Sequence, residues 1–82
     1  MGARVEYKAS VQQDLRKLDR GVARRALNKI EQALVAGQPA GVALAGEFAG
    51  LYRLRVGDWR IIYARTPDGY LVLRIGHRRE IE

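Results

Sequence analysis

The chain has 82 residues, enough for one domain and too few for two. It contains no cysteine and a single histidine, His77, which excludes disulfides, thiolate nucleophiles and histidine-rich metal sites. Fifteen basic residues against nine acidic ones give a net charge of +6, and twelve of the fifteen are arginine, whose planar guanidinium matches phosphate oxygens. We therefore expect a single domain over residues 1–82 that binds nucleic acid, an acidic protein or both.

The first third of the chain reads as a strand followed by a short helix. Polar and apolar residues alternate over residues 4–8, which predicts a strand. Ser10 stands three residues before Gln13, the spacing of a capping box, which predicts a helix over residues 11–18. No apolar run is long enough to cross a bilayer, and the N-terminus lacks the apolar centre of a signal peptide, so we expect a cytoplasmic protein without a membrane partner.

A second helix is indicated by an apolar stripe at steps of three and four residues from Ala23 to Leu34. Gly37 is placed to end this helix, and Pro39 follows two residues later. Residues 38–50 contain three glycines and read as a connecting loop with a short turn.

The C-terminal half changes to the alternating pattern of strands. Residues 51–56, 59–65 and 70–75 are rich in strand-forming residues, and turn sequences separate them at 57–58 and 66–69. The order β-α-α-β-β-β predicts an α+β domain, an antiparallel sheet with two N-terminal helices on one face.

The first C-terminal hairpin brings arginines together. A two-residue turn at 57–58 pairs Val56 with Trp59 and Arg55 with Arg60, and Arg53 lies on the same face. The opposite face then carries the residues expected in the core, namely Tyr52, Leu54, Val56, Trp59, Ile61 and Tyr63.

The second hairpin allows two registers. A two-residue loop pairs Thr66 with Gly69, whereas a three-residue loop pairs Thr66 with Tyr70. We favour the three-residue loop because it makes one face uniformly apolar. It adds Leu71, Leu73 and Ile75 to the core side and Arg74 to the arginine side.

The predicted arginine face carries five cations: Arg53, Arg55, Arg60, Arg74 and, just beyond the last strand, Arg78. The pattern places no acidic residue there, and we expect Arg60 and Arg78 to be exposed. Arginine stems can simply cover a sheet while their head groups stay solvated. Because like charges directly opposite each other destabilise a sheet, the cluster favours the alternative reading, a site for an anion.

An arginine cluster can catalyse cleavage of RNA, because RNA supplies its own nucleophile in the 2′-hydroxyl beside each phosphate. Cations align that hydroxyl and stabilise the added negative charge of the transition state. His77 and Glu82 are the candidates for proton transfer, and each can equally be a solvated tail residue. Ser10 and Thr66 fit structural roles in a cap and a turn, and we expect no metal and no cofactor.

Two segments carry a family resemblance. The sequence LAGEFAGLYRLRVGDWRIIY at 44–63 and the ending IGHRREI at 75–81 are similar to the signature of RelE-type toxins of bacterial toxin–antitoxin pairs. The similarity extends over essentially the whole chain. It favours the RelE group over the related ParE group, whose C-terminal region usually departs from this pattern.

The resemblance implies a metal-independent endoribonuclease that cuts messenger RNA in the ribosomal A site, leaving a 2′,3′-cyclic phosphate and a 5′-hydroxyl. The matching catalytic positions are Arg53, Arg55, Arg60 and Arg78, and Arg74 and Arg79 are expected to bind RNA. The implied partners are the ribosome, its messenger RNA and a small acidic RelB-like antitoxin, in a toxin–antitoxin hetero-oligomer.

One departure from the family pattern leaves alternatives open. The family usually places a tyrosine shortly after the Arg-Glu pair, and here Glu82 stands at that place. Either Glu82 or His77 would then transfer the proton. The missing tyrosine also keeps open a ParE-like toxin that binds DNA gyrase without cutting RNA, and an inactive relative that only binds an antitoxin.

Overall fold

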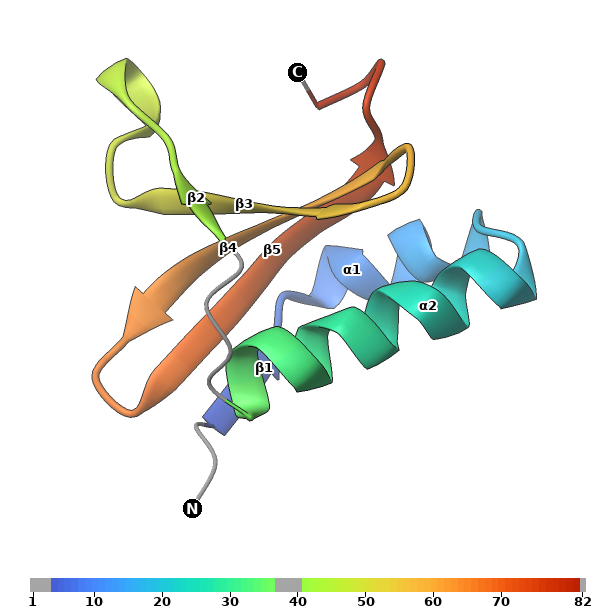
Figure 1. Ribbon diagram of the computed structural model, residues 1–82, viewed down its shortest axis with the longest axis horizontal. Helices are drawn as coiled ribbons and strands as arrows, with labels where there is room; N and C mark the ends of the chain where they lie inside the picture. Colours follow the sequence, from blue (N-terminus) through green and yellow to red (C-terminus); the bar gives the residue numbers. More distant parts are fainter. Residues whose placement is uncertain (1–3, 37–40, 82) are drawn as a thin grey trace.

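The structure is a computed structural model that describes residues 4–36 and 41–81, with two helices on one face of a five-stranded sheet (Figure 1). The helical layer comprises α1 (Ala9–Arg16) and α2 (Arg20–Ile30), which continues into the π-helical turn η1 (Glu31–Val35). The sheet comprises β1 (Arg4–Tyr7), β2 (Val42–Ala43), β3 (Leu51–Val56), β4 (Trp59–Thr66) and β5 (Gly69–His77). The 3₁₀ turn η2 (Gly46–Phe48) lies between β2 and β3. The predicted α+β class, with both helices on one face, is confirmed.

The sheet is mixed rather than antiparallel, which corrects the sequence-based expectation. Its strand order is β1-β5-β4-β3-β2, and β1 runs parallel to β5 while every other pair is antiparallel. Gly69 permits this pairing, because a Cβ atom there would overlap the Arg4 carbonyl. The short strand β2 pairs Val42 with Arg53 inside the segment expected to be a loop.

The first helix starts earlier than predicted, and the second helix has an ordinary side-chain cap at its start. Helix α1 begins at Ala9, not near residue 11, and Lys8 precedes it without a side-chain cap, so Ser10 forms no capping box. Helix α2 is capped by Asp19, whose Oδ2 accepts a hydrogen bond from the Gly21 N–H at 3.0 Å. In the described part of the chain, no helix is long and apolar enough to cross a membrane. The predicted helix end at Gly37 and Pro39 lies outside the described residues.

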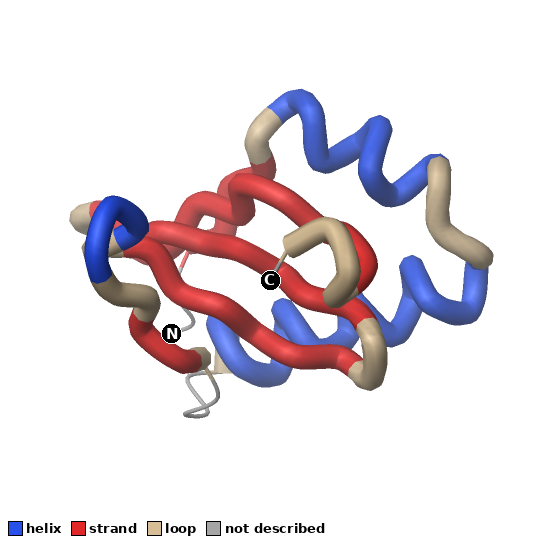
Figure 2. Tube along the Cα trace, turned by 90° about the horizontal axis from the view of Figure 1, so that it is seen from above, coloured by secondary structure: helices blue, strands red, loops and turns tan. Residues whose placement is uncertain are grey.

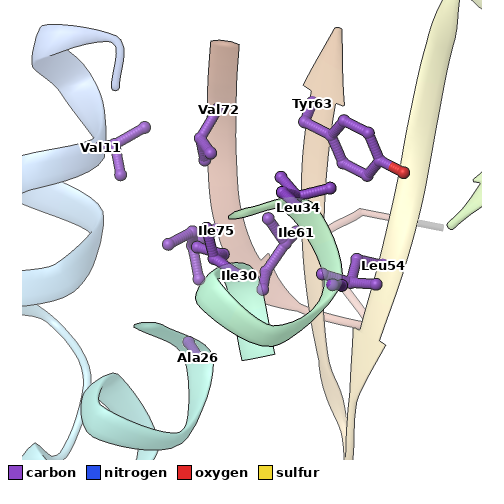
Figure 3. Close-up of a cluster of buried hydrophobic side chains, with 10 residues drawn as sticks. Val11, Ala26, Ile30, Leu34, Leu54, Ile61, Tyr63, Val72 and Ile75 are labelled. Atoms are coloured by element: carbon purple, nitrogen blue, oxygen red, sulfur yellow. The ribbon is translucent and has the colours of Figure 1, made fainter. Parts of the chain in front are cut away.

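The core lies between α1, α2 and the helix-facing side of β3, β4 and β5 (Figure 3). Helical spacing directs Val11, Ala26 and Ile30 toward the sheet, and Leu54 and Ile61 meet them from β3 and β4. The predicted core face of the first hairpin is confirmed for every residue except Trp59, which is half-buried and does not belong to the core cluster. Tyr63 is also buried, and its ring contacts those of Tyr52 and Tyr70, with centroids 5.4 and 5.5 Å apart.

The β4–β5 hairpin combines the two registers considered above. At its turn, Thr66 pairs with Gly69, so the three-residue loop is wrong. The register shifts between Tyr63, which pairs with Val72, and Ile62, which pairs with Arg74, so Leu73 is an extra, bulged residue. Beyond the bulge, from Ile62 and Arg74 onward, the pairing is the one that the three-residue loop would give.

The bulge corrects the core assignment of β5. Val72 and Ile75 are the buried residues of this strand, while Leu71 and Leu73 are only half-buried. Leu73 and Arg74 both lie on the face away from the helices, because both line the groove described below.

The outer edge of β5 is closed by two different elements. Strand β1 pairs with β5 only as far as Val72. Beyond it, Asp14 of α1 reaches the edge, and its Oδ2 accepts a hydrogen bond from the Ile75 N–H at 3.1 Å. The Ile75 N–H lies at a partly buried sheet edge and needs a hydrogen-bond partner. The Asp14 side chain supplies the acceptor that a neighbouring strand would otherwise provide.

We predict that Leu54→Ala lowers the free energy of unfolding by about 2–5 kcal/mol, because it leaves a cavity where a fully buried side chain meets the helices. Leu27→Ala is the matched control, since Leu27 is 40% exposed on α2, and its loss should be far smaller. Urea denaturation followed by circular dichroism measures both. Equal losses would contradict the core described here.

Candidate nucleic-acid interface

Four arginines of the C-terminal half lie in two rows across the sheet face opposite the helices. Figure 2 looks onto this face, with the chain after β5 folded across it. In one row, Arg53 of β3 and Arg74 of β5 both flank Ile62 of β4. In the next row, Arg55 lies directly opposite Arg60, as the sequence predicted. The β4–β5 bulge is what returns Arg74 to this face.

A groove of about 380 Å³ runs along this face beside Arg53 and Arg74. Strand residues Leu51, Ile62 and Leu73 come from the sheet itself. The segment after β2 contributes Leu44 and Phe48, and the C-terminal turn contributes Glu80 and Ile81. Three segments distant in the sequence therefore form one apolar groove with two guanidinium groups beside it.

Arg53 combines a place beside the groove with a desolvated hydrogen-bond donor. Its side chain is half-buried, and its Nε is buried without a hydrogen-bond partner among residues 4–36 and 41–81. A desolvated donor without an acceptor costs about 1–3 kcal/mol. Such groups in folded proteins call for an explanation, and a functional role is a common one.

Arg60 is buried, which corrects the expectation that it is exposed. It is 3% exposed, and one Nη atom donates to the Gly57 and Trp59 carbonyls, each at 2.9 Å. These bonds tie the side chain to the β3–β4 turn. In this arrangement Arg60 supports the turn, whereas Arg55, its partner across the hairpin, is exposed.

The chain after β5 turns back over the arginine face. The Glu80 and Ile81 N–H groups both donate to the His77 carbonyl, at 2.8 and 3.2 Å. Gly76 makes room for the turn, since a Cβ atom there would lie 2.8 Å from the Ile81 Cδ1 atom. The turn brings Glu80 into the groove, where its Oε2 lies 3.9 Å from an Nη atom of Arg74.

Acidic residues therefore do accompany the arginines, contrary to the sequence expectation. Besides the Arg74–Glu80 pair, the Nε of Arg78 lies 3.8 Å from an Oδ of Asp58, and the Arg78 N–H donates to the Asp58 carbonyl at 2.8 Å. Both ion pairs are largely exposed, so solvent screens them and each contributes little to stability. Their carboxylates can yield to a phosphate.

His77, one of the two candidate proton carriers, lies on the face away from the groove. His77 pairs with Trp59 in register and lies edge-on to its ring, with centroids 5.2 Å apart, on the side opposite Arg60. Its Nδ1 accepts a hydrogen bond from the Arg79 N–H at 3.2 Å. Arg79 itself is exposed beside Arg78. Glu82 lies outside the described residues.

Two groove residues with a charged or aromatic side chain were missed by sequence reasoning. Glu80 is part of the quoted ending IGHRREI, but only a turn that reverses the chain after His77 directs it back to Arg74. Phe48 falls in the segment expected to be a loop, and an exposed aromatic residue in a loop gives no periodic signal. The signal that was available is that Phe48 is the single phenylalanine of the chain and lies within the family-like segment 44–63.

The tyrosines of the sheet lie on the helix-facing side and do not replace the missing family tyrosine. Burial raises the pKa of the Tyr63 hydroxyl, and the neighbouring Tyr70 and Tyr52 raise it further. The guanidinium of Arg65 lies over the Tyr52 ring, 5.6 Å from its centroid. These rings stabilise the sheet on the face away from the groove.

Comparison with known structures finds the same fold in several toxins. The toxin–antitoxin complex RelBE2 of Mycobacterium tuberculosis contains a chain with a TM-score of 0.80 and 21% identity, covering 95% of this chain and all of that one. The RelE–RelB complex of Pyrococcus horikoshii gives 0.71 and 26%, covering 95% and 97%. YafQ of Escherichia coli gives 0.66 and 19%, covering 96% and 97%. No curated protein sequence matches this chain.

The sequence itself matches a family profile described as the ParE toxin of the type II toxin–antitoxin system parDE, over residues 5–82. The match spans nearly the whole chain, and the RelE-type structures share its fold. The predicted superfamily is confirmed, while the preference for RelE-type over ParE-type activity stays a prediction. The chain belongs to the ParE toxin family of type II toxin–antitoxin systems, within the wider group of RelE-like toxins.

Proposed function

We propose that this toxin is an endoribonuclease that cleaves messenger RNA in the ribosomal A site without a metal ion. The observation that carries the proposal is the placement of Arg53 and Arg74 on either side of Ile62, in one row on the open face. Two strand spacings separate them, about 10 Å between backbones. Long arginine side chains can close that gap around a single phosphate.

The proposed reaction transfers the phosphoryl group within the RNA. The 2′-oxygen of one nucleotide forms a bond to the adjacent phosphorus, and the bond from phosphorus to the 5′-oxygen of the next nucleotide breaks. The products are a 2′,3′-cyclic phosphate and a 5′-hydroxyl. One proton leaves the 2′-hydroxyl and one arrives at the departing 5′-oxygen. Guanidinium groups stabilise the extra negative charge at phosphorus in the transition state.

The positions of these side chains support the following proposed roles. Arg53 and Arg74 hold the phosphate, and exposed Arg55, Arg78 and Arg79 bind the flanking backbone. Arg60 supports the turn that carries Asp58, and through it Arg78. Glu80 takes the proton of the 2′-hydroxyl because its carboxylate lies in the groove.

The proposed partners are the ribosome with its messenger RNA and an acidic antitoxin. The RelBE2 complex of Mycobacterium tuberculosis and the DinJ–YafQ complex of Escherichia coli are toxin–antitoxin complexes, and each contains a chain of the same fold. A net charge of +6 favours an acidic inhibitor that covers the arginine face. We propose such a hetero-oligomer in the cytoplasm, where the toxin meets translating ribosomes.

A second candidate function is inhibition of DNA gyrase by binding, with no cleavage of RNA. The family profile favours it, because that profile describes ParE toxins. The two candidates differ in what they damage: one cuts messenger RNA, and the other produces gyrase-dependent breaks in DNA.

We predict that Arg53→Ala and Arg74→Ala each slow messenger RNA cleavage on translating ribosomes by roughly 10²–10³-fold, the effect of removing a transition-state donor. Arg24→Ala on the exposed side of α2 is the matched control and should leave the rate unchanged. Primer extension maps the cuts. Intact messenger RNA with gyrase-dependent DNA breaks would reject the nuclease and select the second candidate.

Arg60→Ala should act mainly on stability. Removing a buried side chain that donates to two turn carbonyls should lower the free energy of unfolding by about 1–3 kcal/mol. Arg55→Ala, on the exposed partner across the hairpin, should change it by less than about 0.5 kcal/mol. Urea titration distinguishes them, and equal stabilities would show that Arg60 does not hold the turn.

Glu80→Gln should slow cleavage by roughly 10²–10⁴-fold while leaving RNA binding nearly intact, because the amide cannot accept the proton. His77→Gln tests the competing carrier, and a small effect is expected since its ring lies on the other side of the sheet. Single-turnover rates on programmed ribosomes measure both. A larger loss for His77→Gln would move the proton-transfer role to the histidine.

A further inference from the structure

Phe48 is the most exposed of the large hydrophobic side chains in the described chain, at 54%. Exposing an aromatic ring forfeits the free energy of burying it, so a partner that covers the ring would recover that energy. The ring lies at the groove rather than on an unrelated surface. The other described aromatic side chains do not line this groove. Tyr52, Tyr63, Tyr70 and Trp59 lie toward the helix-facing side of the sheet, and Tyr7 lies on the distant strand β1.

The loop around Phe48 is closed by its own backbone. The Leu44 N–H donates to the Leu51 carbonyl at 2.9 Å, and within η2 the Ala49 N–H donates to the Gly46 carbonyl at 3.1 Å. These bonds hold the segment against the start of β3, the strand that carries Arg53. The ring is therefore placed by a short hydrogen-bonded loop and not by a long tether.

Resting on the proposed nuclease function, we infer that the groove is a nucleobase site in which Phe48 stacks on a base next to the phosphate held by Arg53 and Arg74. The apolar side chains of Leu51, Ile62 and Leu73 line that site from the sheet. Bases taken out of a stack are commonly held between aromatic and apolar side chains. A volume of about 380 Å³ lies within the range of small-ligand sites.

The chemistry at the groove edge favours a nucleotide as occupant. Arg53 retains an unfulfilled donor in the described structure, and Arg74 has only an exposed, solvent-screened ion pair with Glu80. Cations at one side of an aromatic and apolar groove match a phosphate joined to a base. Because a stack tolerates every base, the site gives affinity and position more than sequence preference.

The test uses ribosomes programmed with messenger RNA that carries 2-aminopurine at each A-site position in turn, with a 2′-deoxy sugar to prevent cleavage. Binding of the wild-type toxin should quench the fluorescence at one position through stacking. Phe48→Ala and Phe48→Leu should abolish the quenching and slow cleavage of unmodified messenger RNA by roughly 5- to 100-fold, the loss of one stacked base. Phe48→Tyr should retain both.

Tyr7→Ala is the matched control, since Tyr7 is an aromatic residue 42% exposed on β1, and it should behave as wild type. If the wild type cleaves messenger RNA while Phe48→Ala matches Tyr7→Ala, the base site is wrong and the nuclease stands. Absence of cleavage by the wild type overturns both. If Phe48→Ala weakens only binding of the co-expressed acidic antitoxin, the groove receives a protein and the inference is wrong.

Discussion

Because Leu73 is an extra residue opposite β4, the strand β5 serves two surfaces with different chemistry. Before the bulge, Val72 points to the helices, and after it Ile75 does so again. Between them Leu73 and Arg74 both reach the open face. If Leu73 were paired regularly and not bulged, Arg74 would lie opposite the buried Ile61 and its charge would point into the core. The bulge therefore supports the apolar core and the arginine pair at once.

The helix-facing side of the sheet provides stability, and the open side carries the candidate binding groove. The helix-facing side joins aliphatic and tyrosine side chains into a continuous cluster. The open side is only partly covered, by η2 at one end and the C-terminal turn at the other. Each covering segment adds a polar or aromatic group that strands alone do not provide. Glu80 and Phe48 thus join a surface whose arginines come from the strands.

Sequence patterns correctly predicted the features that depend on contacts between neighbouring segments. The Gly57-containing turn fixed the first hairpin and the Arg55–Arg60 pair, which two adjacent strands specify without help from elsewhere. The parallel partner of β1, the Leu73 bulge and the burial of Arg60 depend on contacts between segments far apart in sequence, and no periodicity encodes them. Of the site, the arginine face was therefore predictable, while the groove that Glu80 helps to form was not.

The bond from Asp14 to the Ile75 N–H has a consequence for how copies of this protein meet one another. A strand edge that ends in open N–H and C=O groups invites pairing with a second molecule. Beyond β1 such pairing is blocked, because the Asp14 carboxylate already accepts the hydrogen bond of the Ile75 N–H. Its negative charge also lies where the backbone carbonyl of an incoming strand would have to bind. One side chain therefore protects the part of the β5 edge beyond β1 against pairing with a second molecule.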